Sequence, residues 1–335
     1  MIDYRTEAPP ILRDFLSYHL TIKAHSPRTV NEYFLDLRNF FRYLKQLRDP
    51  SCRHKELDEI DILDVDVNFI KSVTLTDVYD YLNYLSTERA RHHNSSRTEH
   101  GISAASRARK IATIRSFYKY LTTKAHVLSE NPLKDIDSPK LRKTLPRYLT
   151  LDESIQLLNT VDGKHRERDY CILTLFLNCG IRISELVGLN LGDIQGETLR
   201  ILGKGNKVRI VFLNDACQSA LEEYLAVRRP IYGRDQNALF LSGQDSRISR
   251  SNVHALVKKH LGAAGLDASQ YSSHKLRHTA ATLMLQNGVD VRAVQEVLGH
   301  EHLNTTEIYT HVDNEGLRVA AKANPLSKMK SQGKS

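Results

Sequence analysis

The stretch from Tyr271 to Tyr309 restricts the fold of this chain most, because its apolar residues follow a helical period. A first helix is predicted by apolar residues three and four positions apart, Leu276, Ala280, Leu283 and Met284. Gly288 is expected to end it, and a second apolar run ends at Gly299. The pattern therefore predicts two short helices, each packed by one face.

The same stretch also contains residues with chemically reactive side chains. His274, Arg277 and His278 are spaced i, i+3 and i+4, which places them on one face of the first helix. His300 directly follows the second helix, and Tyr309 lies nine positions further on. A single histidine is usually a surface residue and a single tyrosine is usually packing. Imidazoles, a guanidinium and a phenol together indicate a site that binds a phosphate and attacks it.

A zinc site is the weaker alternative for the same helix. His274 and His278 have the i, i+4 spacing of two zinc ligands. However, the residues between them include no glutamate to act as a base, and Arg277 would place a fixed positive charge beside the metal. We therefore expect no metal and no cofactor.

Composition favours a polyanionic partner. Lysine and arginine number 48 against 39 aspartates and glutamates, a formal net charge of +9 over 335 residues, which is enough chain for two domains. The cysteines show no paired metal spacing, which suits a reducing compartment: Cys52, Cys171, Cys179 and Cys217. The sequence MIDYRTEAPP lacks the basic start and apolar core of a signal peptide, and no apolar run reaches the ~20 residues of a membrane span. We expect a cytoplasmic protein without membrane association.

Residues 1–125 are expected to form a helical DNA-binding domain. Amphipathic patterns predict helices over 10–24, from Ser26 to Leu44, over 76–85 and from Ser103 to Leu121. A cationic helix face is usually solvated surface, but the last of these helices lies beside the basic loop 89–101. Its cations are therefore predicted to contact DNA: Arg107, Arg109, Lys110, Arg115 and Lys119. Residues 126–148, which hold three prolines and no periodic pattern, are the expected linker.

Residues 149–335 are expected to form the catalytic domain. Arg182 follows a glycine at the start of a short helix, where Glu185, three positions on, either supports it or caps the helix. The run TLRILGKGNKVRIVFL predicts two antiparallel strands, with Lys204 at the tip of a tight turn. A short helix over 313–323 cannot be stable alone and must dock on its own domain or on a neighbour. The predicted fold is mainly α with a small antiparallel β-sheet.

Six residues would form one pocket for strand transfer. Tyrosine deprotonation costs about 4 kcal/mol at pH 7, which a base and a cationic phosphate site can supply. Tyr309 would be the nucleophile, His274 its base, and Arg182 and Arg277 the ligands of the non-bridging phosphate oxygens. His300 would add a hydrogen bond to the phosphate, and Lys204 would protonate the leaving 5′ oxygen. Because one phosphodiester is exchanged for another, the scheme needs neither ATP nor a metal.

The motifs GIRISEL, GKGNKVR, HKLRH, LGH and TEIYTHV resemble the signature of the tyrosine recombinases, the family of bacteriophage integrases and bacterial Xer proteins. By position, Arg182, Lys204, His274, Arg277, His300 and Tyr309 match the catalytic set of that family. The resemblance covers residues 150–325 closely and the helical N-terminal part more loosely. The short basic tail makes the chain most similar to the Xer members.

The resemblance implies a two-domain clamp around double-stranded DNA and a tetramer on two DNA sites. The tetramer would be a homotetramer or a heterotetramer with a paralogue, and a DNA translocase is a further expected partner. The C-terminal helix would dock on the next subunit through Leu317 and Val319. Resolution of chromosome or plasmid dimers is the leading hypothesis. An integrase of a phage or conjugative element and a DNA-binding protein without activity remain as alternatives.

Overall fold

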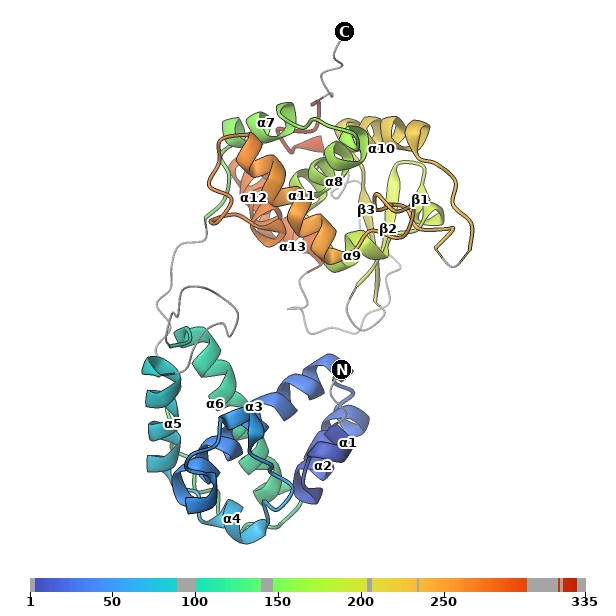
Figure 1. Ribbon diagram of the computed structural model, residues 1–335. Coiled ribbons are helices and arrows are strands. Elements are labelled where there is room, and N and C mark those ends of the chain that lie inside the picture. The colour runs from blue at the N-terminus through green and yellow to red at the C-terminus, as the bar shows by residue number, and fades with distance from the viewer. Residues whose placement is uncertain are drawn as a thin grey trace. The chain divides into compact units, whose positions relative to one another are not determined.

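The computed structural model describes residues 4–88, 101–139, 147–203, 207–233, 235–299, 319 and 322–329. The chain divides into two compact units, Met1–Lys143 (unit 1) and Thr144–Ser335 (unit 2), which are described separately. Both are mainly helical, and unit 2 also contains a three-stranded antiparallel sheet (Figure 1). The fold class predicted from the sequence is thereby confirmed.

Unit 1 is built from helices and short turns. In chain order these are α1 (Tyr4–Glu7), α2 (Pro10–Ser17), the π-helical turn η1 (Tyr18–Ile22), α3 (Pro27–Arg48), the 3-10 turns η2 (Pro50–Cys52) and η3 (Leu57–Glu59), α4 (Val67–Lys71), α5 (Leu75–Thr87) and α6 (Ala104–Thr123). Ser26 starts α3 by accepting a hydrogen bond from the backbone N–H of Thr29, and Ser103 starts α6 in the same way. The two helices pack against each other around buried Phe41 and Phe117.

The chain after α6 belongs to unit 1. Leu128, Leu133 and Ile136 are buried in its core, and Arg115 donates a hydrogen bond to the carbonyl oxygen of Ile136. The linker expected over 126–148 is therefore packed on unit 1 for the first part of its length. These three apolar residues follow neither a helical nor a strand period, so the sequence pattern did not predict their burial. Their burial stabilises the position of the segment on unit 1.

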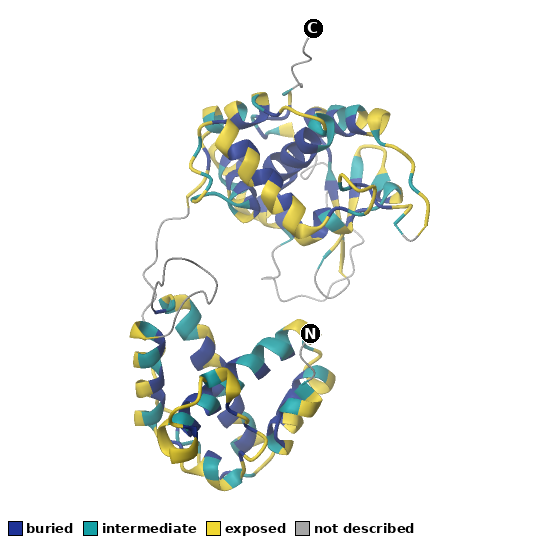
Figure 2. Cartoon of the chain, viewed as in Figure 1, coloured by how far each residue is buried: buried dark blue, intermediate teal, exposed yellow. Residues whose placement is uncertain are grey.

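Unit 2 contains the remaining elements. They are α7 (Leu151–Asn159), α8 (Arg166–Cys179), α9 (Ile183–Gly188), the 3-10 turn η4 (Leu191–Asp193), β1 (Ile194–Gln195), β2 (Thr198–Leu202), β3 (Val208–Phe212), α10 (Asp215–Val227), α11 (Arg250–Ala263), α12 (Ser273–Gln286) and α13 (Val291–Leu298). Every residue of α8 from Asp169 to Cys179 is buried, and the helix lies at the centre, packed against α10 and α12 (Figure 2). Gly180, in the left-handed conformation, ends it.

The sheet has the strand order β1-β2-β3 with antiparallel pairs throughout. In the register of β2 and β3, Ile201 is opposite Arg209 and Leu202 is opposite Val208. Side chains alternate between faces in a strand, so Arg209 shares its face with the buried Ile201 and Val211. The second face carries Leu202, Val208 and Ile210, which are exposed.

The described part of the C-terminal segment docks on unit 2. Leu326 is fully buried in the core, and the side chain of Asn324 donates to the carbonyl oxygen of Leu177 in α8. Val319, one of the two expected contacts with a neighbouring subunit, is 58% exposed. The other, Leu317, lies outside the described residues.

Candidate active site

Arg182 lies at the N-terminal end of α9. Its Nη1 donates to Glu185 Oε1 at 2.8 Å, and its backbone N–H donates to Glu185 Oε2 at 2.7 Å. A second contact comes from a distant part of the chain, because Arg182 Nη2 donates to the carbonyl oxygen of Gly299 at 3.1 Å. Glu185 therefore both supports Arg182 and caps the helix, the two roles that the sequence left open.

Glu185 is the anion at the centre of the site. Its side chain is 3% exposed and also accepts two hydrogen bonds from Arg209, at 2.7 and 2.8 Å. Burial by itself raises the pKa of Glu185, but the hydrogen bonds and charges of Arg209 and Arg182 outweigh it and lower that pKa from 4.5 to about 2. The carboxylate is therefore ionised at neutral pH and holds two guanidinium groups.

Arg277 is buried on α12. Its Nη1 donates to the carbonyl oxygen of Gly180, and its Nη2 to that of Leu298, both at 2.6 Å. Burial, with repulsion from Arg182, lowers the pKa of Arg277 to about 10, so the guanidinium remains charged at neutral pH. Among the described residues these bonds use two of the five N–H donors of Arg277.

Arg182 and Arg277 meet at the C-terminal end of α13. One binds the carbonyl oxygen of Gly299 and the other that of Leu298, so both cations are held by the last carbonyl groups of one helix. Cations are favoured at this end of a helix dipole. Gly299 adopts the left-handed conformation there, and His300 is the next residue in the chain.

His274 lies in the first turn of α12, one helical turn before Arg277, and its side chain is exposed, as is that of His278. Desolvation of the ring is the largest influence on His274 and, with the charges of His254 and Arg277, lowers its pKa below 6.5. A neutral imidazole at pH 7 can accept a proton. The structure therefore brings Arg182 and Arg277 together and places a proton acceptor on the same helix as one of them.

Three predicted site residues, Lys204, His300 and Tyr309, lie outside the described residues. Gly203, directly before Lys204, and Gly299, directly before His300, are described. Gly203 donates from its backbone N–H to the carbonyl oxygen of Lys207, so the ends of the β2–β3 loop that contains Lys204 are joined.

The cations predicted to bind DNA on α6 differ in environment. Lys110 is 7% exposed and its Nζ lies 2.7 Å from Asp36 on α3, so its charge is used inside unit 1. Arg109 also binds Asp36 but is half-exposed, and Arg107 donates to the carbonyl oxygen of Ile102. Arg115 is held by the carbonyl oxygen of Ile136, and Lys119 is exposed.

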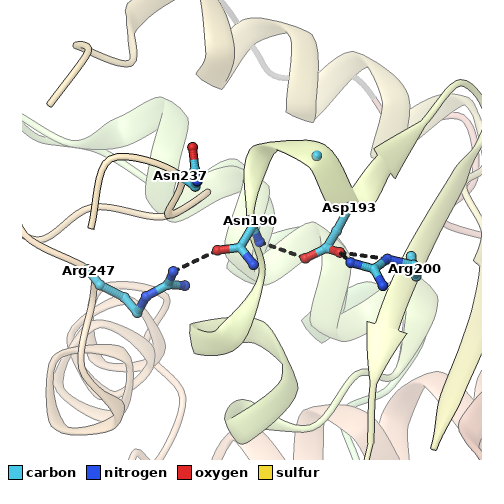
Figure 3. A pocket seen from close by; sticks show the side chains of 6 residues that line it. Asn190, Asp193, Arg200, Asn237 and Arg247 are labelled. Atoms are coloured by element: carbon cyan, nitrogen blue, oxygen red, sulfur yellow. Dashed lines mark hydrogen bonds and ion pairs between the residues drawn. The ribbon is translucent and has the colours of Figure 1, made fainter. Parts of the chain in front are cut away.

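A polar pocket of about 390 Å³ lies beyond the other end of α9. It is lined by Asn190, Gly192, Asp193, Arg200, Asn237 and Arg247. Figure 3 shows Arg247 directed toward Asn190, and Arg200 paired with Asp193. Arg247 also binds the carbonyl oxygens of Val187 and Leu189 at 3.0 and 2.9 Å. These bonds anchor the C-terminal end of the short helix that carries Arg182 at its N-terminal end.

Arg209 belongs to the site but was not predicted from the sequence. The signal was present in the alternation of TLRIL and VRIVF. Once the hairpin register is set, Arg209 falls on the same face as Leu199 and Ile201. A charged residue on the buried face of a sheet requires a partner, and here the partner is Glu185.

Neither a metal cluster nor a membrane span is found in the part of the chain that the structure describes. Within those ranges no three histidine, cysteine, aspartate or glutamate side chains are grouped to hold a metal ion. No described helix is long and apolar enough to cross a bilayer.

Comparison with known proteins identifies the family. The phage integrase family matches residues 147–315, and the N-terminal SAM-like domain of phage integrases matches residues 12–125. The tyrosine recombinase XerC of Caldanaerobacter subterraneus subsp. tengcongensis is 51% identical over 320 residues, covering 95% of this chain and 88% of that protein. XerC of Myxococcus xanthus is 36% identical over 322 residues, covering 93% and 96%.

Solved structures of other recombinases have a fold similar to that of this chain. A crystal structure of the XerH site-specific recombinase, in a post-cleavage complex with a palindromic difH substrate, has a TM-score of 0.59 at 25% identity and covers 88% of this chain and 79% of that chain. A lambda integrase (75–356) dimer bound to a COC′ core site has a TM-score of 0.57 at 16% identity, covering 90% and 99%.

The chain belongs to the phage integrase family, whose model and N-terminal domain model together match most of its length. Within that family it is a tyrosine-type site-specific DNA recombinase of the Xer type, which acts by transesterification. The integrase and inactive DNA-binding alternatives are not favoured by these relatives.

Proposed function

We propose that the protein cuts one DNA strand through Tyr309 and holds the cut phosphate between Arg182 and Arg277. The observation that carries this proposal is the anchoring of both guanidinium groups on the Leu298–Gly299 turn. Two fixed cations at one place suit the non-bridging oxygens of a phosphodiester, whose charge increases in the transition state.

The reaction exchanges one phosphate ester for another. The phenolic oxygen of Tyr309 attacks phosphorus, the bond to the 5′ oxygen breaks, and a 3′-phosphotyrosyl link forms. His274 accepts the phenol proton, Lys204 donates a proton to the departing 5′ oxygen, and His300 donates a hydrogen bond to the phosphate. A 5′ hydroxyl from a second strand then attacks the tyrosyl ester, which restores the phenol. The number of phosphodiesters is conserved, so no ATP is consumed.

The stoichiometry of this reaction supports a tetramer. Exchange between two duplexes requires cuts in four strands, and each protomer has one Tyr309. Four protomers would be identical or would alternate with a paralogue. Val319 is exposed and suits a contact with the next subunit.

Both units are proposed to bind the same duplex as a clamp. In unit 1, Arg107, Arg109, Arg115 and Lys119 are the proposed phosphate contacts. Lys110 is not among them, because its charge is paired internally with Asp36. The net charge of +9 supports binding to a polyanion.

The proposed role is the resolution of chromosome or plasmid dimers in the cytoplasm, with a DNA translocase as a further partner. The XerC relatives support the Xer role, and the XerH site-specific recombinase bound to its difH substrate supports action at a specific site. The four cysteines, all among the described residues, are buried free thiols.

The test is covalent trapping in the source organism. DNA fragments attached to the protein are recovered after denaturation, sequenced and mapped on the chromosome. Wild-type protein and Tyr232→Phe, which changes a tyrosine that is 92% exposed, are expected to trap one locus. Tyr309→Phe is expected to bind DNA and trap none. A covalent adduct with Tyr309→Phe contradicts the nucleophile, and fragments from the ends of a mobile element favour the integrase role.

A further inference from the structure

We propose that Arg209 is a positioning residue that couples the β2–β3 hairpin to the phosphate-binding arginines through Glu185 and Gly299. The proposal rests on the assignment of Arg182 as a phosphate ligand. Arg209 would touch neither the DNA nor the reacting atoms. It would fix the position of the Arg182 side chain. It would also fix the position of the β2–β3 hairpin, which contains Lys204, relative to Arg182.

The position of Arg209 in the sheet is the first argument. It lies on β3 opposite Ile201, on the face that packs into the core of unit 2, and its side chain is 14% exposed. Placing a guanidinium there costs free energy unless its donors are satisfied. A residue that served only the stability of the sheet would be apolar at this position, as Ile201 and Val211 are.

The bidentate contact with Glu185 is the second argument. Arg209 Nη1 and Nη2 contact Oε1 and Oε2 at 2.7 and 2.8 Å, a geometry that fixes the plane of the carboxylate. The same two oxygens accept from Arg182 Nη1 and from the Arg182 backbone N–H. The orientation of the Glu185 carboxylate therefore determines the orientation of Arg182. Arg209 in turn fixes the orientation of that carboxylate.

The contact with Gly299 is the third argument. A β-carbon added at Gly299 would lie 2.9 Å from Arg209 Cδ and 3.1 Å from Arg209 Nε, so the arginine stem lies directly against this glycine. The carbonyl oxygen of Gly299 in turn accepts from Arg182 Nη2. Arg209 thus contacts both groups that hold Arg182, one from α9 and one from the end of α13.

These contacts connect three segments that are far apart in the chain. Arg209 lies two residues after Lys207, which joins Gly203 at the base of the loop that contains Lys204. A displacement of the hairpin would move Arg209, and with it Glu185 and the support of Gly299. One side chain therefore links the segment that carries the proposed general acid to a proposed phosphate ligand.

The experiment measures single-turnover formation of the covalent complex on a nicked duplex made from the DNA recovered by trapping. Rates at saturating DNA, half-saturating DNA concentrations and melting temperatures are compared for wild type, Arg209→Gln, Arg209→Lys, Glu185→Gln and Glu185→Gln/Arg209→Gln. Arg200→Gln is the matched control, because Arg200 is a sheet arginine paired with a carboxylate, Asp193, but has no contact with Glu185 among the described residues.

Arg209→Gln is expected to lower the rate about 10- to 100-fold, as loss of a supporting shell does in other sites. The half-saturating DNA concentration should change less than about threefold, because no phosphate contact is lost. Arg209→Lys should recover part of the rate, since lysine keeps the charge and loses the fixed fork. The double variant should be no slower than the slower single variant, because both changes act through one carboxylate. Arg200→Gln should form the covalent complex at the wild-type rate.

Three results would overturn the proposal: an Arg209→Gln rate equal to wild type, a loss carried entirely by DNA affinity, or effects of Glu185→Gln and Arg209→Gln that multiply in the double variant. If Arg209→Gln does not fold, Arg209→Lys decides, with a reduced rate at an unchanged melting temperature as the supporting result and an unchanged rate as the contrary one. If wild-type protein forms no covalent complex, the proposed function fails rather than the role of Arg209.

Discussion

The guanidinium of Arg277 donates to the carbonyl oxygen of Gly180 at 2.6 Å, which joins α12 to the residue that ends the central helix α8. Gly180 has a φ of +58°, and a β-carbon there would lie 2.4 Å from Leu298 Cδ2. Leu298 provides the second carbonyl group that holds Arg277. Gly180 therefore fixes the backbone on which this buried cation depends.

Gly180→Ala is expected to lower the free energy of unfolding by about 2–4 kcal/mol, from left-handed strain and the overlap with Leu298. Urea denaturation measures this loss. Gly196→Ala is the control, because Gly196 has a φ of +57° with nothing near its would-be β-carbon. Its loss should be about 1–2 kcal/mol, with covalent complex formation unchanged. Equal losses in the two variants would contradict the contact with Leu298.

Glu185 should make stability depend on pH in acid. The pKa of Glu185 in the folded protein is about 2, below the ordinary value of 4.5. Its ionised form therefore contributes fully to the free energy of unfolding above pH 4.5, and this contribution is lost as the pH falls toward 2. The size of that contribution is about 3 kcal/mol. Glu185→Gln should therefore unfold with a weaker pH dependence than wild type between pH 4.5 and 3, as measured by chemical denaturation. Parallel curves for the two proteins would exclude this contribution.

His274 should titrate below pH 6.5 in the free protein. Desolvation and neighbouring positive charge lower its pKa, so the neutral, proton-accepting form persists to lower pH than in an ordinary histidine. NMR titration of the imidazole signals, assigned with His274→Gln, measures the midpoint. A midpoint above 6.5 would contradict the lowered pKa. His274→Gln should also slow covalent complex formation by about 10²- to 10⁴-fold if His274 is the base.

Lys119 and Lys110 should differ in their effects on DNA binding. Lys119→Gln removes an exposed charge on α6 and is expected to reduce the slope of log affinity against log salt by about 0.9, one phosphate contact on duplex DNA. Lys110→Met should leave that slope unchanged and lower the free energy of unfolding, because it leaves the buried Asp36 with one cation fewer. Fluorescence anisotropy with a generic duplex at several salt concentrations measures both slopes. A reduced slope for Lys110→Met would show that Lys110 contacts DNA despite its burial.

Local features of this protein were predictable from the sequence because they depend on residues close together in the chain. Helical spacing predicted α12 and α13, serine caps predicted the starts of α3 and α6, and glycine-flanked alternation predicted β2 and β3. The position of Arg182 at the start of α9 and its partnership with Glu185 follow from a spacing of three residues. Each of these is determined by backbone geometry and hydrogen bonds within one or two turns of chain.

Which charged side chains are buried, and which segments pack into a core, depends on contacts between residues far apart in the chain. Lys110 is paired with Asp36 across 74 residues, Arg277 is held by Gly180 across 97, and Arg182 is held by Gly299 across 117. Leu128 and Ile136 left no periodic signal, yet they are buried in unit 1. A charged side chain has the same local propensity whether it meets solvent or a buried carboxylate. The free energy that separates these environments comes from desolvation and from partners that folding brings together.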